Sequence, residues 1–148
     1  MKIRWLMTIG VALTSYAAGA LTPVAFTQSA SKAPRYVALG YMKVPAAGGQ
    51  AYLALERDVW KPIHRKLIAS GAERAWTLYG VVSGGTGDPH NFVTIQEFDS
   101  LDPFFDADYG KVAVEAHPGK SMESIMEQTL KARDLVAMKL MERIDHVE

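Results

Sequence analysis

The chain has 148 residues, of which 49% are hydrophobic, and its 16 basic and 16 acidic residues cancel to a net charge of zero. This length suits one domain of ordinary size with a hydrophobic core. The sequence contains no cysteine, which excludes disulfides and a lipoprotein anchor. Its charges are mixed without a basic stripe, which argues against nucleic acid as a partner.

The first 20 residues have the composition of a secretory signal peptide. Lys2 and Arg4 form a short basic start, residues 5–14 are uncharged and largely apolar, and residues 18–20 (AGA) match a small-residue cleavage site. The apolar stretch is too short to cross about 30 Å of hydrocarbon as a transmembrane helix. We therefore expect residues 1–20 to be removed on export, and a second cleavage site within residues 27–33 is the alternative.

The remainder divides into a spacer and a domain. Residues 21–34 are small, polar and bounded by proline, which is typical of a disordered linker. Residues 35–148 carry the periodic patterns of secondary structure and are expected to form one folded domain. We expect the mature protein to be periplasmic or secreted and to have no membrane span.

A strand and a long helix are predicted at the start of this domain. Residues 35–44 carry apolar side chains on both alternating faces, which indicates a strand. Within residues 50–70 an apolar residue recurs every three or four positions, and Gly71 follows as a stop signal. Pro62 removes one backbone donor inside this helix, so we expect a kink, or a junction of two helices, near Trp60.

The middle of the chain predicts a hairpin. Residues 74–82 are again apolar on both faces, and residues 91–98 form a third strand. Residues 83–90 between them contain three glycines and one proline. We therefore expect the two strands to pair antiparallel through a loop that is longer than a tight turn.

The C-terminal part predicts short helical turns, a second clear helix and a final strand. Two turns are expected within residues 99–120, and Ser121 begins the helix. Residues 135–144 fit either a strand or a continuation of the helix, and their few β-branched residues favour helix. We interpret them as a strand because three strands need a fourth partner. The order predicts an α+β, ferredoxin-like βαββαβ fold, a four-stranded antiparallel sheet with helices on one face.

Three segments carry a resemblance to a known superfamily. The segments YMKVP (41–45), LERDVWKPIH (55–64) and NFVTIQEFDS (91–100), with the element order over residues 35–147, resemble the dimeric α/β barrel superfamily, in particular its uncharacterised exported members. The resemblance implies a homodimer that pairs sheet to sheet and encloses a pocket. Strands that are apolar on both faces fit this pairing. A monomer whose segment 99–120 folds across the second face is the alternative.

Seven residues are candidates for a ligand-binding site. They are polar or aromatic and fall on the predicted helix and strands: Tyr41, Glu56, Trp60, His64, Trp76, Tyr79 and Asn91. Glu56, Trp60 and His64 recur at four-residue spacing on one side of the helix, where His64 would serve as a general base or a ligand. The resemblance implies that Asn, Trp and Tyr side chains serve cofactor-free oxygenation. The simpler interpretation is that the aromatic residues pack in the core, that His64 lies at the surface or at an interface, and that Asn91 forms a turn.

Our functional interpretation is an exported homodimer, non-catalytic or binding a small apolar or aromatic ligand. The first alternative is a cofactor-independent monooxygenase-like enzyme acting on an aromatic or phenolic substrate, and the second is a haem-binding protein that uses His64, His90 or His117. The histidines lack the close spacing of a metal site, and the glycine-rich loop at 83–89 does not precede a helix. We therefore expect no metal and no cofactor, and we assign no catalytic residue.

Overall fold

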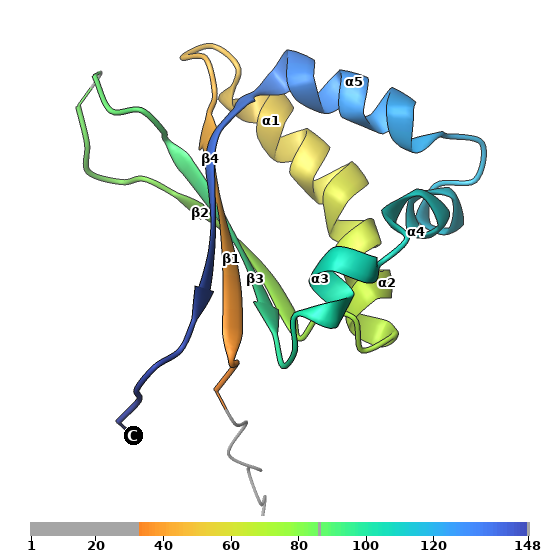
Figure 1. The fold of residues 1–148 in the computed structure, drawn as a ribbon. Helices are drawn as coiled ribbons and strands as arrows, with labels where there is room; N and C mark the ends of the chain where they lie inside the picture. Colours follow the sequence, from red (N-terminus) through yellow and green to blue (C-terminus); the bar gives the residue numbers. More distant parts are fainter. Residues whose placement is uncertain (1–32, 86, 148) are drawn as a thin grey trace, which may run out of the picture. The chain divides into compact units, whose positions relative to one another are not determined.

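The computed structural model describes residues 33–85 and 87–147. The predicted signal peptide (residues 1–20) lies outside the described residues, and so does the predicted linker (residues 21–34) as far as residue 32. The described part is an α+β domain. It has one four-stranded antiparallel sheet with its helices on one side, as Figure 1 shows.

The elements follow the predicted order, and two short helices lie between the third strand and the last helix. They are β1 (Tyr36–Lys43), α1 (Gly49–Leu55), the π-helix η1 (Glu56–Trp60), α2 (Lys61–Ala69), β2 (Ala75–Gly80), β3 (Phe92–Phe98), α3 (Asp102–Asp106), α4 (Tyr109–Ala116), α5 (Met122–Ala132) and β4 (Asp134–Glu142). The short helices α3 and α4 account for the helical turns expected within residues 99–120. No helix in the described part is long and apolar enough to cross a bilayer.

The four strands pair in the order β2–β3–β1–β4, and each neighbouring pair is antiparallel. At the centre, Leu39 of β1 lies opposite Ile95 of β3 and Lys139 of β4. The strand interpretation of residues 135–144 is therefore confirmed, and the helical one is wrong. This strand order, with helices on one side, is compatible with a ferredoxin-like fold.

The irregularity expected from Pro62 takes the form of a π-helical segment. The backbone N–H of Lys61 donates to the carbonyl of Glu56, five residues earlier, so the helix widens by one residue before α2 begins. Pro62 follows in the first turn of α2, so its missing N–H falls where the hydrogen-bond pattern changes from π-helical to α-helical. Figure 1 shows α1, η1 and α2 as one continuous helical run.

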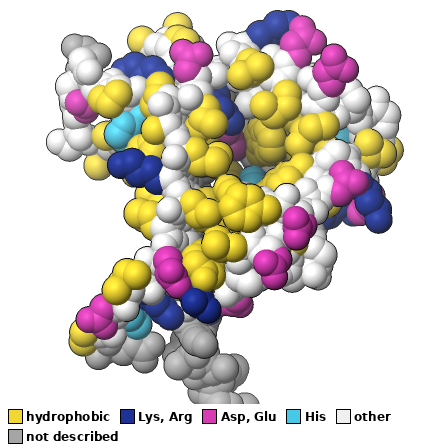
Figure 2. Space-filling view, viewed as in Figure 1, with side chains coloured by type: hydrophobic (Ala, Val, Ile, Leu, Met, Phe, Trp, Pro, Cys, Tyr) yellow, Lys and Arg dark blue, Asp and Glu magenta, His cyan; other side chains and the backbone are white. Residues whose placement is uncertain are grey.

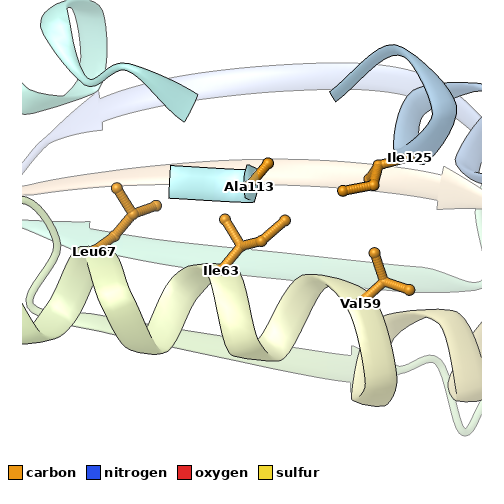
Figure 3. Close-up of a cluster of buried hydrophobic side chains, with 5 residues drawn as sticks. All are labelled: Val59, Ile63, Leu67, Ala113 and Ile125. Carbon is orange, nitrogen blue, oxygen red and sulfur yellow. The ribbon is translucent and has the colours of Figure 1, made fainter. Parts of the chain in front are cut away.

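A cluster of buried apolar side chains joins this helical run to α4 and α5. Val59, Ile63 and Leu67 meet Ala113 of α4 and Ile125 of α5, as Figure 3 shows, and none of the five is more than 6% exposed. Apolar burial of this kind is the main stabilising contribution in a small domain without disulfides. The cluster therefore forms the core shared by the helices.

A second cluster holds α1 to one end of the sheet. Tyr52 of α1 is fully buried against Met42 and Val44, and Leu78 and Phe92 pack beside them. The rings of Tyr52 and Phe92 lie 4.9 Å apart between centroids. This packing places the first turns of the helical run over the sheet, so that the next turns also face it.

The two faces of the sheet differ in what covers them. Ala38, Gly40 and Met42 of β1 are buried and face the helices, whereas Val37 and Leu39 are only half-buried on the other side. No described helix covers that second side in Figure 1. We call it the open face. Its apolar character matches the pattern that the sequence shows on both sides of the first strand.

Candidate functional site

A cavity of about 350 Å³ lies between the helices and the helix-facing side of the sheet. It is lined from all four strands and most of the helices, by Met42, Glu56, Trp60, His64, Trp76, Thr94, Gln96, Phe104, Tyr109, Met126, Leu130, Arg133, Leu135 and Met138. Figure 2 shows a hollow framed mainly by hydrophobic side chains, with small acidic, basic and histidine surfaces inside it. Its volume falls within the range of about 300–1,000 Å³ that is usual for small-molecule sites.

Three of the predicted site residues enter the cavity from one helical stripe. Glu56, Trp60 and His64 all line it, as their four-residue spacing predicts. Glu56 is 3% exposed and His64 is 6% exposed, so both polar groups are buried. The π-helical turn lies within this stripe, and π-helical turns occur frequently at functional sites.

His64 is held by a buried carboxylate that the sequence-based prediction does not include. Its Nδ1 atom lies 3.0 Å from Oε1 and 2.9 Å from Oε2 of Glu73. The side chain of Glu73 is 1% exposed. An ionised carboxylate only accepts hydrogen bonds, so Nδ1 carries the hydrogen and Nε2 is the free acceptor of the neutral ring.

The end of α2 brings Glu73 back toward His64. Gly71 adopts a φ of +78°, and its N–H donates to the carbonyl of Ile68, while the N–H of Ala72 donates to the carbonyl of Leu67. These two bonds form a Schellman motif, in which the left-handed glycine reverses the chain. The reversal places Glu73 beside the preceding helical turns rather than in solvent.

Two further polar side chains extend this buried network. The Nε2 atom of Gln96 donates to Oε1 of Glu73 over 2.6 Å and to the hydroxyl of Tyr109 over 3.3 Å. Burial, followed by the negative charge of Glu73, raises the pKa of Tyr109. The carboxylate of Glu73 thus has hydrogen-bond donors from α2 and from β3, which compensate for its burial.

Aromatic rings flank the imidazole of His64. The ring of Trp76 stacks on it, with centroids 5.0 Å apart and planes 13° apart, and the ring of Trp60 lies 6.1 Å away. The indole N–H of Trp60 donates to Oγ1 of Thr129 over 3.0 Å, which fixes the orientation of that ring. Because both tryptophans line the cavity, it offers flat aromatic surface beside a histidine.

A second polar group of the cavity is centred on Glu56. Burial is the main cause that raises the pKa of Glu56, and it outweighs the nearby Tyr52, Arg133 and His64, which act in the opposite direction. The Tyr52 hydroxyl interacts with the Glu56 carboxyl and does not line the cavity. Nε of Arg133, which does line it, is buried without a hydrogen-bond partner, and such an atom marks a place for water or a ligand.

The other predicted site residues lie elsewhere, except Trp76. Tyr41 is on the open face, where its ring meets His90 edge-on with centroids 4.9 Å apart. Tyr79 is 53% exposed on the same face. The side chain of Asn91 links the ends of two strands, since it accepts from the N–H of Val44 and donates to the carbonyl of the same residue, each over 2.8 Å. Asn91 therefore joins these two strand ends and is not among the residues that line the cavity.

Four polar residues that line the cavity are absent from the sequence-based candidates: Thr94, Gln96, Tyr109 and Arg133. Glu73, which contacts His64 without lining the cavity, is absent from them as well. A weak signal exists for Gln96, because it is the longest polar side chain on the helix-facing side of its strand. A signal also exists for Glu73, because it is an acidic residue two positions after a glycine that ends a helix. Neither signal identifies a partner without the tertiary structure.

The histidines considered as haem ligands are not gathered at one place. His64 lines the cavity, His90 contacts Tyr41, and Nε2 of His117 donates to the carbonyl of Val59 over 2.8 Å. Within residues 33–85 and 87–147, no three His, Cys, Asp or Glu side chains are grouped closely enough to hold a metal ion.

No family model, curated protein or solved structure matches this chain. The class of the protein therefore rests on its own structure, an α+β domain compatible with the ferredoxin-like fold. The resemblance to the dimeric α/β barrel superfamily stays a prediction. Chemically, the cavity combines tryptophan surface, an acceptor at His64, an acid–base group at Glu56 and a donor at Arg133.

Proposed function

We propose that the protein binds a small, flat and largely apolar ligand in the cavity between its helices and its sheet. The cavity itself carries this proposal, because it is large enough for such a molecule and is walled by Trp60 and Trp76. Its few polar groups converge from separate elements, which is the usual composition of a small-molecule site. Aromatic walls with few polar contacts favour an aromatic ligand over a sugar or a phosphate.

Tryptophan fluorescence tests this proposal. The sequence has three tryptophans, so a Trp5→Phe chain leaves only Trp60 and Trp76, both in the cavity. We expect 4-nitroanisole, a flat arene, to quench this fluorescence saturably, and a saturated ring of similar size to bind at least about tenfold more weakly. Quenching that rises linearly with 4-nitroanisole, without saturation, would contradict the proposal.

A variant that blocks the cavity gives the matched control. Met138 lines the cavity and is 53% exposed, so Met138→Trp places a bulky ring at the opening without disturbing the core. Val136 lies on the same strand, is 44% exposed and does not line the cavity. We expect calorimetry to show lost binding of 4-nitroanisole in Met138→Trp and unchanged binding in Val136→Trp.

We also propose that the protein is a homodimer that pairs through the open face. The apolar side chains of this face alternate with the buried ones along each strand: Val37, Leu39 and Tyr41 of β1, Tyr79 of β2, Val93 and Ile95 of β3, and Ala137 and Met141 of β4. Glu97 and Lys139 lie on the same face and carry opposite charges. Four strands spaced about 4.8 Å apart give a face of roughly 450 Å². Two such faces in contact bury on the order of 1,000 Å², near the lower limit for a specific interface.

Light scattering after size exclusion tests the dimer. Ile95→Lys places a charge at the centre of the open face, whereas Val82→Lys changes a fully exposed residue outside the strands. We expect the wild type and Val82→Lys to have twice the mass of one chain, and Ile95→Lys to have the mass of one. A wild type that is monomeric at micromolar concentration would overturn this part of the proposal.

Export is a further part of the proposed function. It rests on the sequence pattern of residues 1–20 alone, since these residues lie outside the described part. Fractionation of a bacterial culture that expresses the full chain tests it, together with N-terminal sequencing. We expect the protein in the exported fraction with its first residue at position 21.

One observation favours an enzyme of the cofactor-independent monooxygenase type as the second candidate. His64 and Glu73 form the pairing of a general base with the carboxylate that orients it. Oxygen consumption with a panel of hydroquinones tests this activity. A rate that equals the uncatalysed rate for every substrate would leave binding as the function.

A further inference from the structure

The acid–base character of the ligand follows from the arrangement around His64, and this inference rests on the proposed binding function. The carboxylate of Glu73 occupies the Nδ1 side of the ring through two short contacts. Nε2 makes no hydrogen bond within the described residues, and His64 lines the cavity. In the neutral ring, Nε2 therefore offers a lone pair to a bound ligand.

We propose that His64, positioned by Glu73, receives the proton of an acidic hydroxyl on the aromatic ligand, so that the cavity selects hydroxylated arenes and holds them as anions. In this step the O–H bond of the ligand breaks and an N–H bond forms at Nε2. The electron pair stays on the ligand oxygen, and the imidazolium that results is balanced by the Glu73 carboxylate. No other reactant is needed.

The surroundings of His64 favour the charged pair. Its ring is stacked on Trp76, and an imidazolium gains from the electron-rich face of an indole. The side chain of Glu73 is almost fully buried and accepts from Gln96 as well as from His64, so the carboxylate is shielded from bulk solvent. Charge interactions are stronger in such a site than at a solvated surface.

Other titratable and charged groups act on the same step. Glu56 of η1 interacts with the charge of His64 from the neighbouring turn, and Arg133 lines the cavity after α5. Tyr109 of α4 lies at the far end of the Glu73 network. Arg133 attracts a ligand anion, while an ionised Glu56 repels it. Because burial raises the pKa of Glu56, this repulsion decreases as the pH falls.

Two probes with the same ring separate this inference from the binding proposal. 4-Nitrophenol has an acidic hydroxyl and changes its absorption spectrum on ionisation, and 4-nitroanisole carries a methyl group in place of that proton. We expect the full chain to lower the apparent pKa of bound 4-nitrophenol by about one unit or more, which is a tenfold change in ionisation. The methyl ether is expected to bind without this response.

Two variants test the roles of the paired residues. Glu73→Gln preserves the shape and an acceptor for Nδ1 but removes the charge, so the pKa of the bound phenol is expected to return most of the way to its value in water. His64→Asn is expected to abolish the shift. Glu115→Gln on α4 and His90→Asn outside the cavity serve as matched controls and should behave like the wild type.

The outcomes distinguish the two proposals. If Glu73→Gln and His64→Asn still bind 4-nitroanisole within about twofold of the wild type, the cavity is intact and the lost ionisation belongs to the pair. If the wild type binds both probes but does not lower the apparent pKa of 4-nitrophenol, this inference is wrong and the binding proposal stands. If the wild type binds neither probe, the binding proposal fails first.

Discussion

The helical run from α1 to α2 presents two stripes of side chains that share a four-residue spacing and differ in character. Val59, Ile63 and Leu67 face α4 and α5 and form a dry apolar core. Glu56, Trp60 and His64 line the cavity, where two of the three are polar and nearly fully buried. The stripes belong to the same helix and have similar burial, so the difference lies in what each one contacts.

This difference indicates that the cavity stripe is not built for stability alone. Burying a carboxyl and an imidazole costs free energy that apolar side chains of similar size avoid, and their hydrogen bonds recover only part of it. The core stripe shows that this helix can carry apolar residues at the same spacing. The polar stripe therefore fits a binding role.

Truncation of one residue in the core stripe has the largest expected effect on stability. Ile63 is fully buried among α2, α4 and α5, so Ile63→Ala leaves a cavity in the core. We expect the free energy of unfolding to fall by about 2–5 kcal/mol in urea titrations. The same truncation at Ile68, which is 39% exposed on the same helix, should cost less than about 1 kcal/mol. Equal losses would mean that the stripe is not the core.

The burial of the polar residues in the cavity stripe can be tested through the pH dependence of stability. Because burial raises the pKa of Glu56 above the ordinary value of 4.5 for a glutamate, the folded protein binds that proton more tightly than the unfolded chain does. Stability from this group is therefore present below about pH 4.5 and is lost as the pH rises through the folded pKa.

Glu56→Gln removes this titration. We expect the variant to gain stability relative to the wild type as the pH rises from about 4 toward 7, as measured by urea titrations at several pH values. Glu123→Gln, which removes the same charge from the exposed surface of α5, is the control. A gain that is as large in the control would show that net charge, rather than burial, is responsible.

The order of the elements and the Glu56–Trp60–His64 stripe were predictable because both depend on short-range spacing. The start of α5 at its cap Ser121, whose Oγ accepts from the N–H of Ser124, follows from a similar local signal. The final strand has ambiguous periodicity, and only the need of the sheet for a fourth member distinguished the two interpretations.

The rest of the site depends on contacts that no spacing encodes. Alternation along the strands places Tyr41 and Tyr79 on the same face of the sheet, but it does not show which face the helices cover. The cavity lies on the helix-facing side, whereas both tyrosines lie on the open face. Glu73 reaches His64 only because Gly71 reverses the chain. Arg133 enters the cavity from the junction of α5 and β4, where the helical period has already ended.

The coupling between the two stripes can be tested at Thr129. Its buried hydroxyl accepts from the indole of Trp60 and donates to the carbonyl of Ile125, so it links the cavity wall to the core. We expect Thr129→Val to cost about 1 kcal/mol of unfolding free energy, because the indole N–H loses its partner. Binding of 4-nitroanisole should weaken as well, since the ring of Trp60 is no longer fixed.

A matched threonine separates these two effects. Thr77→Val removes a hydroxyl on the open face that makes no hydrogen bond in the described part of the chain. It should leave both stability and 4-nitroanisole binding nearly unchanged. If Thr129→Val weakens folding but not binding, the core stripe and the cavity stripe are less coupled than the Trp60–Thr129 hydrogen bond suggests.

The outer surface of α5 provides the smallest expected effect and sets the scale for the others. Lys131 donates to Glu127 over 2.7 Å at i,i+4 spacing, and the two side chains are 73% and 67% exposed. Such a pair contributes about 0.3–0.5 kcal/mol and is screened by salt. Glu127→Gln should therefore cost no more than this at low salt, less at high salt, and nothing in 4-nitroanisole binding. A larger loss of binding would mean that α5 transmits changes at its surface to Met126 and Leu130 in the cavity wall, and the polar stripe would then not act alone in binding.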